Sequence, residues 1–238
     1  MKKFILFSII VFSLSFSSCT KLEDPRKPVD LSKIVTVGYR GNDSVLIADG
    51  ADNIEVLALL NEDNVTSNIP VTFTTEQGSF VGAGSNPKSI TVKADGYTAK
   101  VVLRSDDVVN DKVQLSVTVG DYIIYPQINF KRSFPEEIIV QPSKFGLTPD
   151  LNDKVLLTMN MKKAIGVVSK GTKVDFKILT LTGTPSLFIQ PVYWNETPLN
   201  KAEVIATTTD TGKVGIISRV FNNSDYINSE DTIYIHVR

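Results

Sequence analysis

The stretch that decides the fold runs from Ala48 to Arg104 and reads ADGADNIEVLALLNEDNVTSNIPVTFTTEQGSFVGAGSNPKSITVKADGYTAKVVLR. Apolar residues recur at every second position in three short runs, which are Ile54, Val56, Ala58 and Leu60, then Val71 and Phe73, then Ala99, Val101 and Leu103. A period of two is typical of a strand that buries one face. Turn dipeptides separate the runs, at Asp49-Gly50, Gln77-Gly78 and Asp95-Gly96.

The same pattern continues beyond this stretch. The alternation returns at Val113, Leu115, Val117 and Val119. Tyr122 to Phe130 forms a further strand, in which Pro126 indicates an edge position. About seven short strands in about 100 residues, without a helical period, predict an antiparallel β-sandwich. We place this sandwich at residues 34–132.

Four segments of this sandwich resemble the bacterial Ig-like domains of the invasin and intimin type. They are ADGADNIEVLALL, IPVTFTTEQGSF, ITVKADGYTAKVVLRS and VQLSVTVGDYIIYPQINF. The segment from Asn61 to Pro70 departs from the resemblance, because it is longer than the family's Asp-x-x-Gly-x-Pro turn and lacks glycine. The resemblance implies a spacer and adhesion fold, which concerns architecture more than activity.

Residues 133–238 carry a second set of alternating runs and are expected to form a second sandwich. We match Val174-Asp-Phe176 with Val71-Thr-Phe73, and Asp210-Thr-Gly212 with the turn at Asp95-Gly96. The fold class that follows is all-β, with two tandem antiparallel Ig-like β-sandwiches after a signal peptide and a short tether.

The two copies differ in length under this alignment. The interval between the matched motifs is longer in the second copy, which predicts an inserted loop at about residues 180–200. The first copy also ends with the strand Tyr122 to Phe130, for which the alignment leaves no counterpart before Arg238. Either the strand count is off by one or the last sandwich has an exposed edge, and we favour the first explanation.

The N-terminal segment has the order of a secretory signal peptide. Two lysines precede an apolar run from Phe4 to Phe16, and the small residues Ser17-Ser18 follow. The run is shorter than the ~20 residues that a membrane-spanning helix needs. We therefore place a signal peptide at residues 1–18.

Cys19 follows directly and is the only cysteine of the chain. A small residue before a cysteine at this place resembles the lipobox of bacterial lipoproteins, with Phe16 instead of the usual leucine, as in the looser lipoboxes of Bacteroidetes. The resemblance implies that Cys19 becomes the acylated N-terminus, and acyl chains at ~0.8 kcal/mol per buried methylene would hold it firmly in a membrane. The alternative is a plain signal peptide that leaves Cys19 as a free thiol.

Residues 19–33 are polar, contain two prolines and show no apolar period, so we expect a tether there. Lys21, Glu23 and Asp24 resemble the short signal that sends some Bacteroidetes lipoproteins to the cell exterior. We therefore expect an outer-membrane lipoprotein, and we favour surface display over a periplasm-facing anchor.

The composition excludes several classes of site. A formal charge of −1 over 238 residues, without a long Lys/Arg block, gives no basis for a nucleic-acid partner. A single cysteine excludes a disulfide within the chain and a site of several thiolates. Acidic groups such as Asp106-Asp107 lack the spacing of a calcium loop, and the only histidine, His236, has no second ligand beside it. We expect no metal, no cofactor and no catalytic residues.

Tyr193 and Trp194 are the candidate ligand-binding residues, because they lie in the Pro-rich part of the expected insertion. Aromatic side chains give much contact energy at a low entropic cost, so the pair could stack a sugar ring or anchor a protein partner. The alternative is that Trp194 fills the core of the sandwich.

Two functions compete. The favoured one is a non-enzymatic, membrane-anchored cell-envelope lipoprotein whose Ig-like domains serve adhesion or act as spacers. The other is an accessory glycan-binding lipoprotein of a polysaccharide-uptake system, which would use the Tyr193/Trp194 loop. An enzyme on a sandwich scaffold would need paired catalytic groups, and the sequence offers none in a recognisable pattern.

Overall fold

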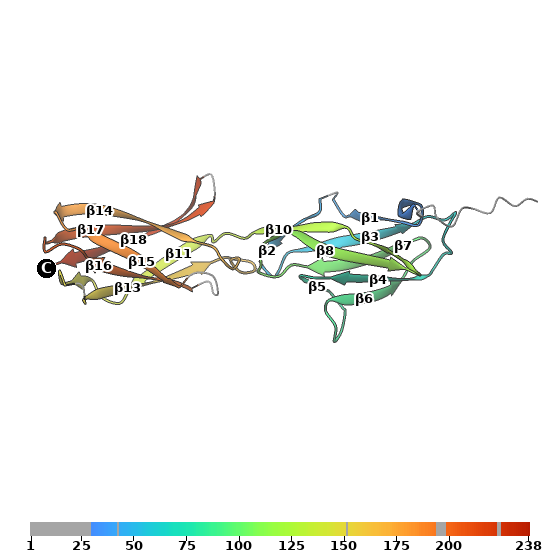
Figure 1. The fold of residues 1–238 in the computed structure, drawn as a ribbon, viewed down its shortest axis with the longest axis horizontal. Coiled ribbons are helices and arrows are strands. Elements are labelled where there is room, and N and C mark those ends of the chain that lie inside the picture. The colour runs from blue at the N-terminus through green and yellow to red at the C-terminus, as the bar shows by residue number, and fades with distance from the viewer. Residues whose placement is uncertain (1–29, 42, 151, 194–198, 223–224) are drawn as a thin grey trace, which may run out of the picture. The chain divides into compact units, whose positions relative to one another are not determined.

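A computed structural model (Figure 1) describes residues 30–41, 43–150, 152–193, 199–222 and 225–238. The chain divides into two units, Met1–Leu31 and Ser32–Arg238, and the second contains all the described strands. The expected signal peptide and most of the expected tether lie outside the described residues. In the described ranges the only helix is the 3-10 helix η1 (Leu31–Lys33), and no helix there is long and apolar enough to cross a membrane.

The first sandwich consists of two sheets that face each other. One sheet has the strand order β1-β3-β7-β5, and the other has the order β2-β10-β8-β4-β6, with β9 paired to β8. Neighbouring strands are antiparallel except for β2 and β10, which run parallel. The strands are β1 (Val35–Tyr39), β2 (Val45–Ala48), β3 (Asn53–Leu60), β4 (Pro70–Thr75), β5 (Ser79–Phe80), β6 (Ser89–Lys93), β7 (Thr98–Arg104), β8 (Asn110–Val119), β9 (Tyr122–Ile124) and β10 (Gln127–Arg132).

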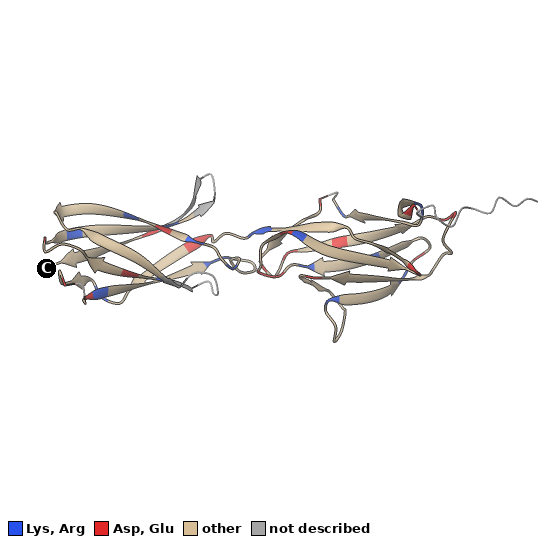
Figure 2. Cartoon of the chain, in the orientation of Figure 1, with Lys and Arg blue, Asp and Glu red and all other residues tan. Residues whose placement is uncertain are grey.

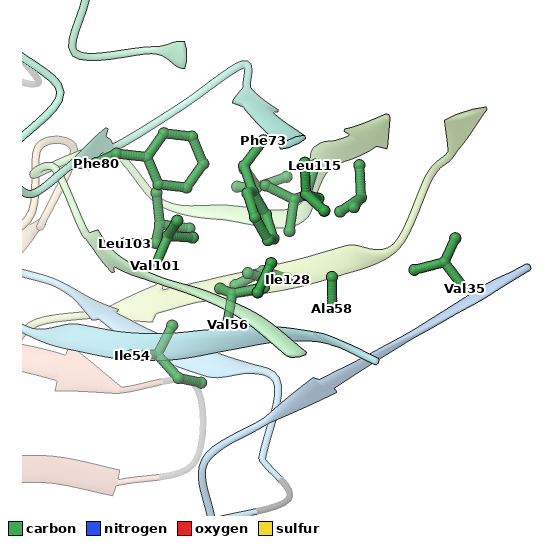
Figure 3. Close-up of a cluster of buried hydrophobic side chains, with 14 of the residues drawn as sticks. Val35, Ile54, Val56, Ala58, Phe73, Phe80, Val101, Leu103, Leu115 and Ile128 are labelled. Carbon is green, nitrogen blue, oxygen red and sulfur yellow. The ribbon is translucent and has the colours of Figure 1, made fainter. Parts of the chain in front are cut away.

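The core of this sandwich is built from the alternating apolar residues that the sequence shows. In β3, β4, β7 and β8 one side chain in two is buried, and these side chains point into the space between the sheets (Figure 3). Phe73 and Phe80 meet edge to face, with ring centroids 6.3 Å apart. Pro126 lies between β9 and β10 rather than in a strand, because proline cannot donate to the sheet ladder.

The second sandwich has the same two-layer plan. Its sheets have the orders β11-β13-β16-β15 and β12-β18-β17-β14, and a second apolar cluster fills the space between them. The strands are β11 (Glu137–Pro142), β12 (Gly146–Leu147), β13 (Lys154–Lys162), β14 (Val174–Gly183), β15 (Leu187–Tyr193), β16 (Leu199–Ala206), β17 (Gly212–Asn222) and β18 (Asp225–Val237). The all-β fold class with two sandwiches is therefore confirmed.

The second sandwich repeats the strand neighbours of the first. β12 pairs in parallel with the last strand β18, as β2 pairs with β10. Likewise β14 pairs with β17, as β4 pairs with β8. The last strand of the chain therefore has a counterpart in the first sandwich. The strand that the sequence alignment left without a counterpart, Tyr122 to Phe130, is therefore explained by a strand count that was off by one.

The match of Gly212 with Gly96 is wrong. Gly96 precedes β7, which pairs with β3, and the strand in that position of the second sandwich is β16, which pairs with β13. Gly212 instead opens β17, the counterpart of β8. A glycine turn indicates that a strand begins, but it does not tell which strand.

Residues 180–200 hold the end of β14, the whole of β15 and the start of β16. Sheet therefore occupies most of the segment in which the sequence predicted an inserted loop. β15 pairs with β16 from Leu187 opposite Ala206 to Tyr193 opposite Lys201. The strand in the same position of the first sandwich, β5, has only two residues. The longer interval itself arises because the two glycines open different strands: the segment from Phe176 to Gly212 includes all of β16, whereas the segment from Phe73 to Gly96 ends before β7.

The turn at Gln77-Gly78 is held by side chains of the loop that follows β7 and of the first residue of β8. The Asp106 carboxylate accepts hydrogen bonds from Gln77 Nε2 at 2.7 Å and from the Gly78 N–H at 3.2 Å. Asn110 Nδ2 donates to Gln77 Oε1 at 3.1 Å. The acidic character of this loop therefore serves the fold. Gly78 itself has φ of +77°, and a β-carbon there would clash with the carbonyl oxygen of Arg104 and lie 3.0 Å from Phe130 Cζ.

We predict that Gly78→Ala lowers the free energy of unfolding by roughly 3 kcal/mol, because left-handed strain and a backbone clash add up. Gly96→Ala is the matched control, since Gly96 has φ of +62° and no neighbouring atom within 4 Å of the place that a β-carbon would take. This control is expected to cost only ~1–2 kcal/mol. Urea denaturation followed by circular dichroism measures both values, and equal losses would contradict the role of the clash.

Candidate functional site

The site residues predicted from the sequence fall outside what the structure describes. Cys19 and Trp194 are not among the described residues. Tyr193 closes β15, where its backbone pairs with Lys201, but its side chain is not described. Lipidation at Cys19 and ligand binding at Tyr193 and Trp194 therefore stay predictions.

A dense set of polar contacts joins the loop between β13 and β14 to the first sandwich. We call residues 163–173 the junction loop. Its backbone N–H groups at Val167 and Lys170 donate to the carbonyl oxygens of Asp49 and Asp107, both at 2.8 Å. The Ser169 hydroxyl donates to the carbonyl oxygen of Ala48 at 2.6 Å. The loop thus bonds to two turns of the first sandwich.

Asp49 is the centre of this contact and is only 6% exposed. One carboxylate oxygen accepts the N–H groups of Ala51 at 2.9 Å and Asp52 at 2.8 Å, which is the side-chain-to-backbone bonding of an Asx turn. The other oxygen accepts a hydrogen bond from Lys163 Nζ at 3.0 Å. The Ala-Asp-Gly turn that the sequence shows at 48–50 therefore supplies an acceptor to the second sandwich as well as a local turn.

Two serines complete the site. Lys163 Nζ also donates to Ser133 Oγ at 2.9 Å. Ser133 and Ser169 are bonded twice, from the Ser133 N–H to Ser169 Oγ at 2.7 Å and from the Ser169 N–H to the Ser133 carbonyl at 3.1 Å. Ser133 lies in the link between β10 and β11. We call Asp49, Ser133, Lys163 and Ser169 the junction cluster.

Gly166 allows the close approach of the junction loop to Asp49. Its φ is +75°, and a β-carbon at this residue would lie 2.7 Å from both Cγ and the carbonyl oxygen of Asp49. No larger residue fits there without displacing the loop. The spacing of Lys163, Gly166 and Ser169 in the sequence KKAIGVVSKG is therefore set by contacts with another part of the chain.

The ionisation of Asp49 reflects these contacts. Burial raises the pKa of its carboxyl, but the hydrogen bonds from Ala51, Asp52 and Lys163 together outweigh burial, so the pKa lies below its ordinary value of 3.8. The carboxylate is therefore charged at neutral pH and paired with the Lys163 ammonium. Such an arrangement fixes a contact between segments and offers no group for proton transfer.

The other polar groups that the sequence singled out are the acidic residues and His236. Among the described residues no group of three or more His, Cys, Asp and Glu side chains is placed to hold a metal ion. His236 is exposed on β18. Lysines and arginines are interspersed with acidic residues along the strands (Figure 2).

The sequence placed the boundary between the sandwiches at residues 132 and 133 but missed the junction loop. Arg132 does take part, since its Nη1 donates to the Lys170 carbonyl and to Thr172 Oγ1, both at 3.3 Å. Neither the loop's composition nor its period distinguishes it from an ordinary strand connection. The only local signal was the glycine at 166, which would indicate a close approach but not its partner.

Comparison with known proteins bears on the fold. No protein-family model matches the chain, and no curated protein matches it. The solved structure of the adhesin InvE of Yersinia pseudotuberculosis is similar with a TM-score of 0.60 at 16% sequence identity, over 90% of this chain and 61% of that one. The structure of invasin, described as a bacterial integrin-binding protein, is similar with a TM-score of 0.54 at 15% identity, over 85% of this chain and 39% of that one.

This chain therefore spans less than two thirds of the length of either protein. At such identities the likeness concerns the fold alone. It confirms the resemblance seen in the sequence: the chain has the bacterial Ig-like fold of the invasin and intimin type.

Proposed function

We propose that this protein is a non-enzymatic lipoprotein of the cell envelope, anchored in the outer membrane through acylated Cys19 and displayed at the cell surface. Its Ig-like sandwiches serve adhesion or hold a binding surface away from the membrane. The fold alone does not determine this function, because Ig-like sandwiches host many activities.

The anchoring rests on the N-terminal sequence. The basic start, the apolar run and the small residues before Cys19 have the order of a lipoprotein signal peptide. Acylation of a cysteine provides a membrane anchor without a spanning helix.

The role in adhesion or spacing is supported by the junction cluster, which is the observation that carries the proposal. A tandem array that presents a surface at a distance from the membrane gains from a fixed contact between its sandwiches, because a flexible linker leaves them free to move relative to each other. Here the Asp49–Lys163 ion pair, at 3.0 Å, and the hydrogen bonds of Ser133 and Ser169 tie a loop of the second sandwich to the first. InvE and invasin, the one named an adhesin and the other an integrin-binding protein, have this type of fold.

The lipid anchor is tested by Cys19→Ser in the host bacterium. The variant should leave the membrane pellet for the soluble fraction, and the mature wild-type N-terminus should carry the mass of acyl chains in mass spectrometry. Ser15→Ala is the control, because it keeps the apolar run and the cysteine. External protease should digest the wild type on whole cells. A wild-type N-terminus without acyl mass, or full protection from protease, would contradict the anchoring or the display.

We predict that Lys163→Met lowers the free energy of unfolding by about 2 kcal/mol, since it leaves a buried carboxylate without its cation and a hydroxyl without its donor. Lys162→Met is the matched control in the neighbouring residue. The Lys162 side chain is 51% exposed and its pair with Glu137 spans 3.8 Å, so this change should cost ~0.5 kcal/mol or less.

The same two variants test the coupling of the sandwiches. Trp194 is the only tryptophan of the chain and falls in the sequence of the second sandwich, so its fluorescence reports on that sandwich. Far-ultraviolet circular dichroism reports on both sandwiches. In the wild type and in Lys162→Met the two signals should change at the same urea concentration. In Lys163→Met the two transitions should separate. Coincident transitions in all three proteins would rule out the junction cluster as the coupling element.

The pKa of Asp49 predicts a pH dependence of stability. Since the folded-state pKa is below the ordinary value of 3.8, the stabilisation is complete above about pH 5 and is lost as the pH falls through the folded-state pKa. At neutral pH the free energy of unfolding of the wild type should exceed that of Asp49→Asn by ~1–3 kcal/mol. This difference should shrink on acidification, because only the wild type has the Asp49 carboxylate to lose. Other carboxyls, such as Asp153 with a pKa of about 2, titrate in both proteins. Urea denaturation at a series of pH values gives the difference, and a constant difference down to about pH 2.5 would contradict the assignment.

A further inference from the structure

A groove runs along one edge of the second sandwich, between β11 and β18. Its volume is about 470 Å³, within the range of ~300–1,000 Å³ that ligand sites occupy. Val140 and Pro142 of β11 form one side, and residues of β17 and β18 form the other. Phe145, in the turn after β11, also lines the groove.

Two aromatic rings in this groove are open to solvent. Phe145 is 63% exposed and Tyr234 is 49% exposed. Tyr234 lies opposite Gly215 of β17, and its ring carbon Cε1 lies 3.5 Å from the place that a β-carbon of this glycine would take. An exposed aromatic pair offers a stacking surface whose burial by a ligand would be favourable.

Two donor groups lie beside the rings. Lys213 Nζ sits 4.9 Å from the centroid of the Tyr234 ring, and in the described part of the chain it has no carboxylate partner. His236 lies directly opposite Lys213 in the pairing of β17 with β18, and its exposed imidazole carries an N–H donor in either protonation state. An ammonium and an imidazole next to each other suit a carboxylate of a ligand.

The edge of β11 is unsuited to an added peptide strand. The Val140 N–H, which faces the groove, already donates to Asp231 Oδ2 at 2.7 Å. Pro142 has no N–H to offer. An added peptide strand would need free N–H donors along β11. Val140 and Pro142 offer none to it. A ligand that binds by ring stacking and by its own polar groups avoids this obstacle.

We propose that this groove binds an acidic glycan, with a sugar ring against Tyr234 and Phe145 and its uronate carboxylate between Lys213 and His236. The site is separate from the segment of Tyr193 and Trp194. It also stands apart from the proposed anchoring and display, since the purified soluble chain should bind the glycan as well.

The test is affinity electrophoresis of the purified chain from residue 20 onward through gels that contain polygalacturonate, a polymer of uronic acid. Polygalacturonate should retard the wild type, and added salt should weaken the retardation because the Lys213–carboxylate pair is exposed. Dextran, a neutral glucan, and polyglutamate, an acidic chain without sugar rings, should not retard it. Thermal unfolding of each variant checks that it is folded.

Tyr234→Ala should weaken the binding of polygalacturonate on the order of tenfold, and Lys213→Met should weaken it and remove most of the salt dependence. Tyr125→Ala and Lys100→Met are the matched controls. Tyr125 is a 59% exposed tyrosine of the first sandwich and Lys100 an exposed lysine of β7, and both changes should leave binding intact. No retardation by polygalacturonate, equal retardation by polyglutamate, or equal losses in the controls would overturn the proposal.

Discussion

In both sandwiches the first strand leaves one sheet and continues in the other, where it pairs in parallel with the last strand. β1 pairs with β3 but β2 with β10, and β11 pairs with β13 but β12 with β18. In the first sandwich this pairing sets Ala48 opposite Arg132. Asp49 and Ser133, the next residues on each strand, therefore emerge side by side, and the junction cluster forms where the two strands end.

The length of that parallel pairing also explains the groove. β2 covers four residues of the six-residue strand β10, from Asn129 to Arg132. β12 covers only His236 and Val237 of the 13-residue strand β18. The rest of β18 faces β11 without a strand between them, and Asp231 bridges the two by accepting the Val140 N–H. The same parallel pairing therefore covers most of the last strand in the first sandwich but leaves most of it uncovered in the second.

The sequence was sufficient for the fold, because the burial of alternate residues is a local property. The apolar positions of β3 and β8 are buried as their period of two predicts. It was insufficient for strand identity in the second sandwich, because glycine turns look alike whichever strand they precede. The match of Gly212 with Gly96 failed for that reason, and the prediction of an insertion at 180–200 followed from it.

The site was beyond local reasoning because its parts lie far apart in the chain. Asp49 and Lys163 are 114 residues apart, and Ala48 and Ser169 are 121 apart. A buried ion pair also adds little net stability, since the desolvation of both charges offsets most of their attraction. What the ion pair adds is specificity. One oxygen of the Asp49 carboxylate already accepts two backbone N–H groups, so only the other oxygen is left for a cation. The junction loop can approach Asp49 this closely only with a glycine at position 166. The junction cluster thus selects one pairing of loop and turn, because only Lys163 at this place gives the Asp49 carboxylate its cation.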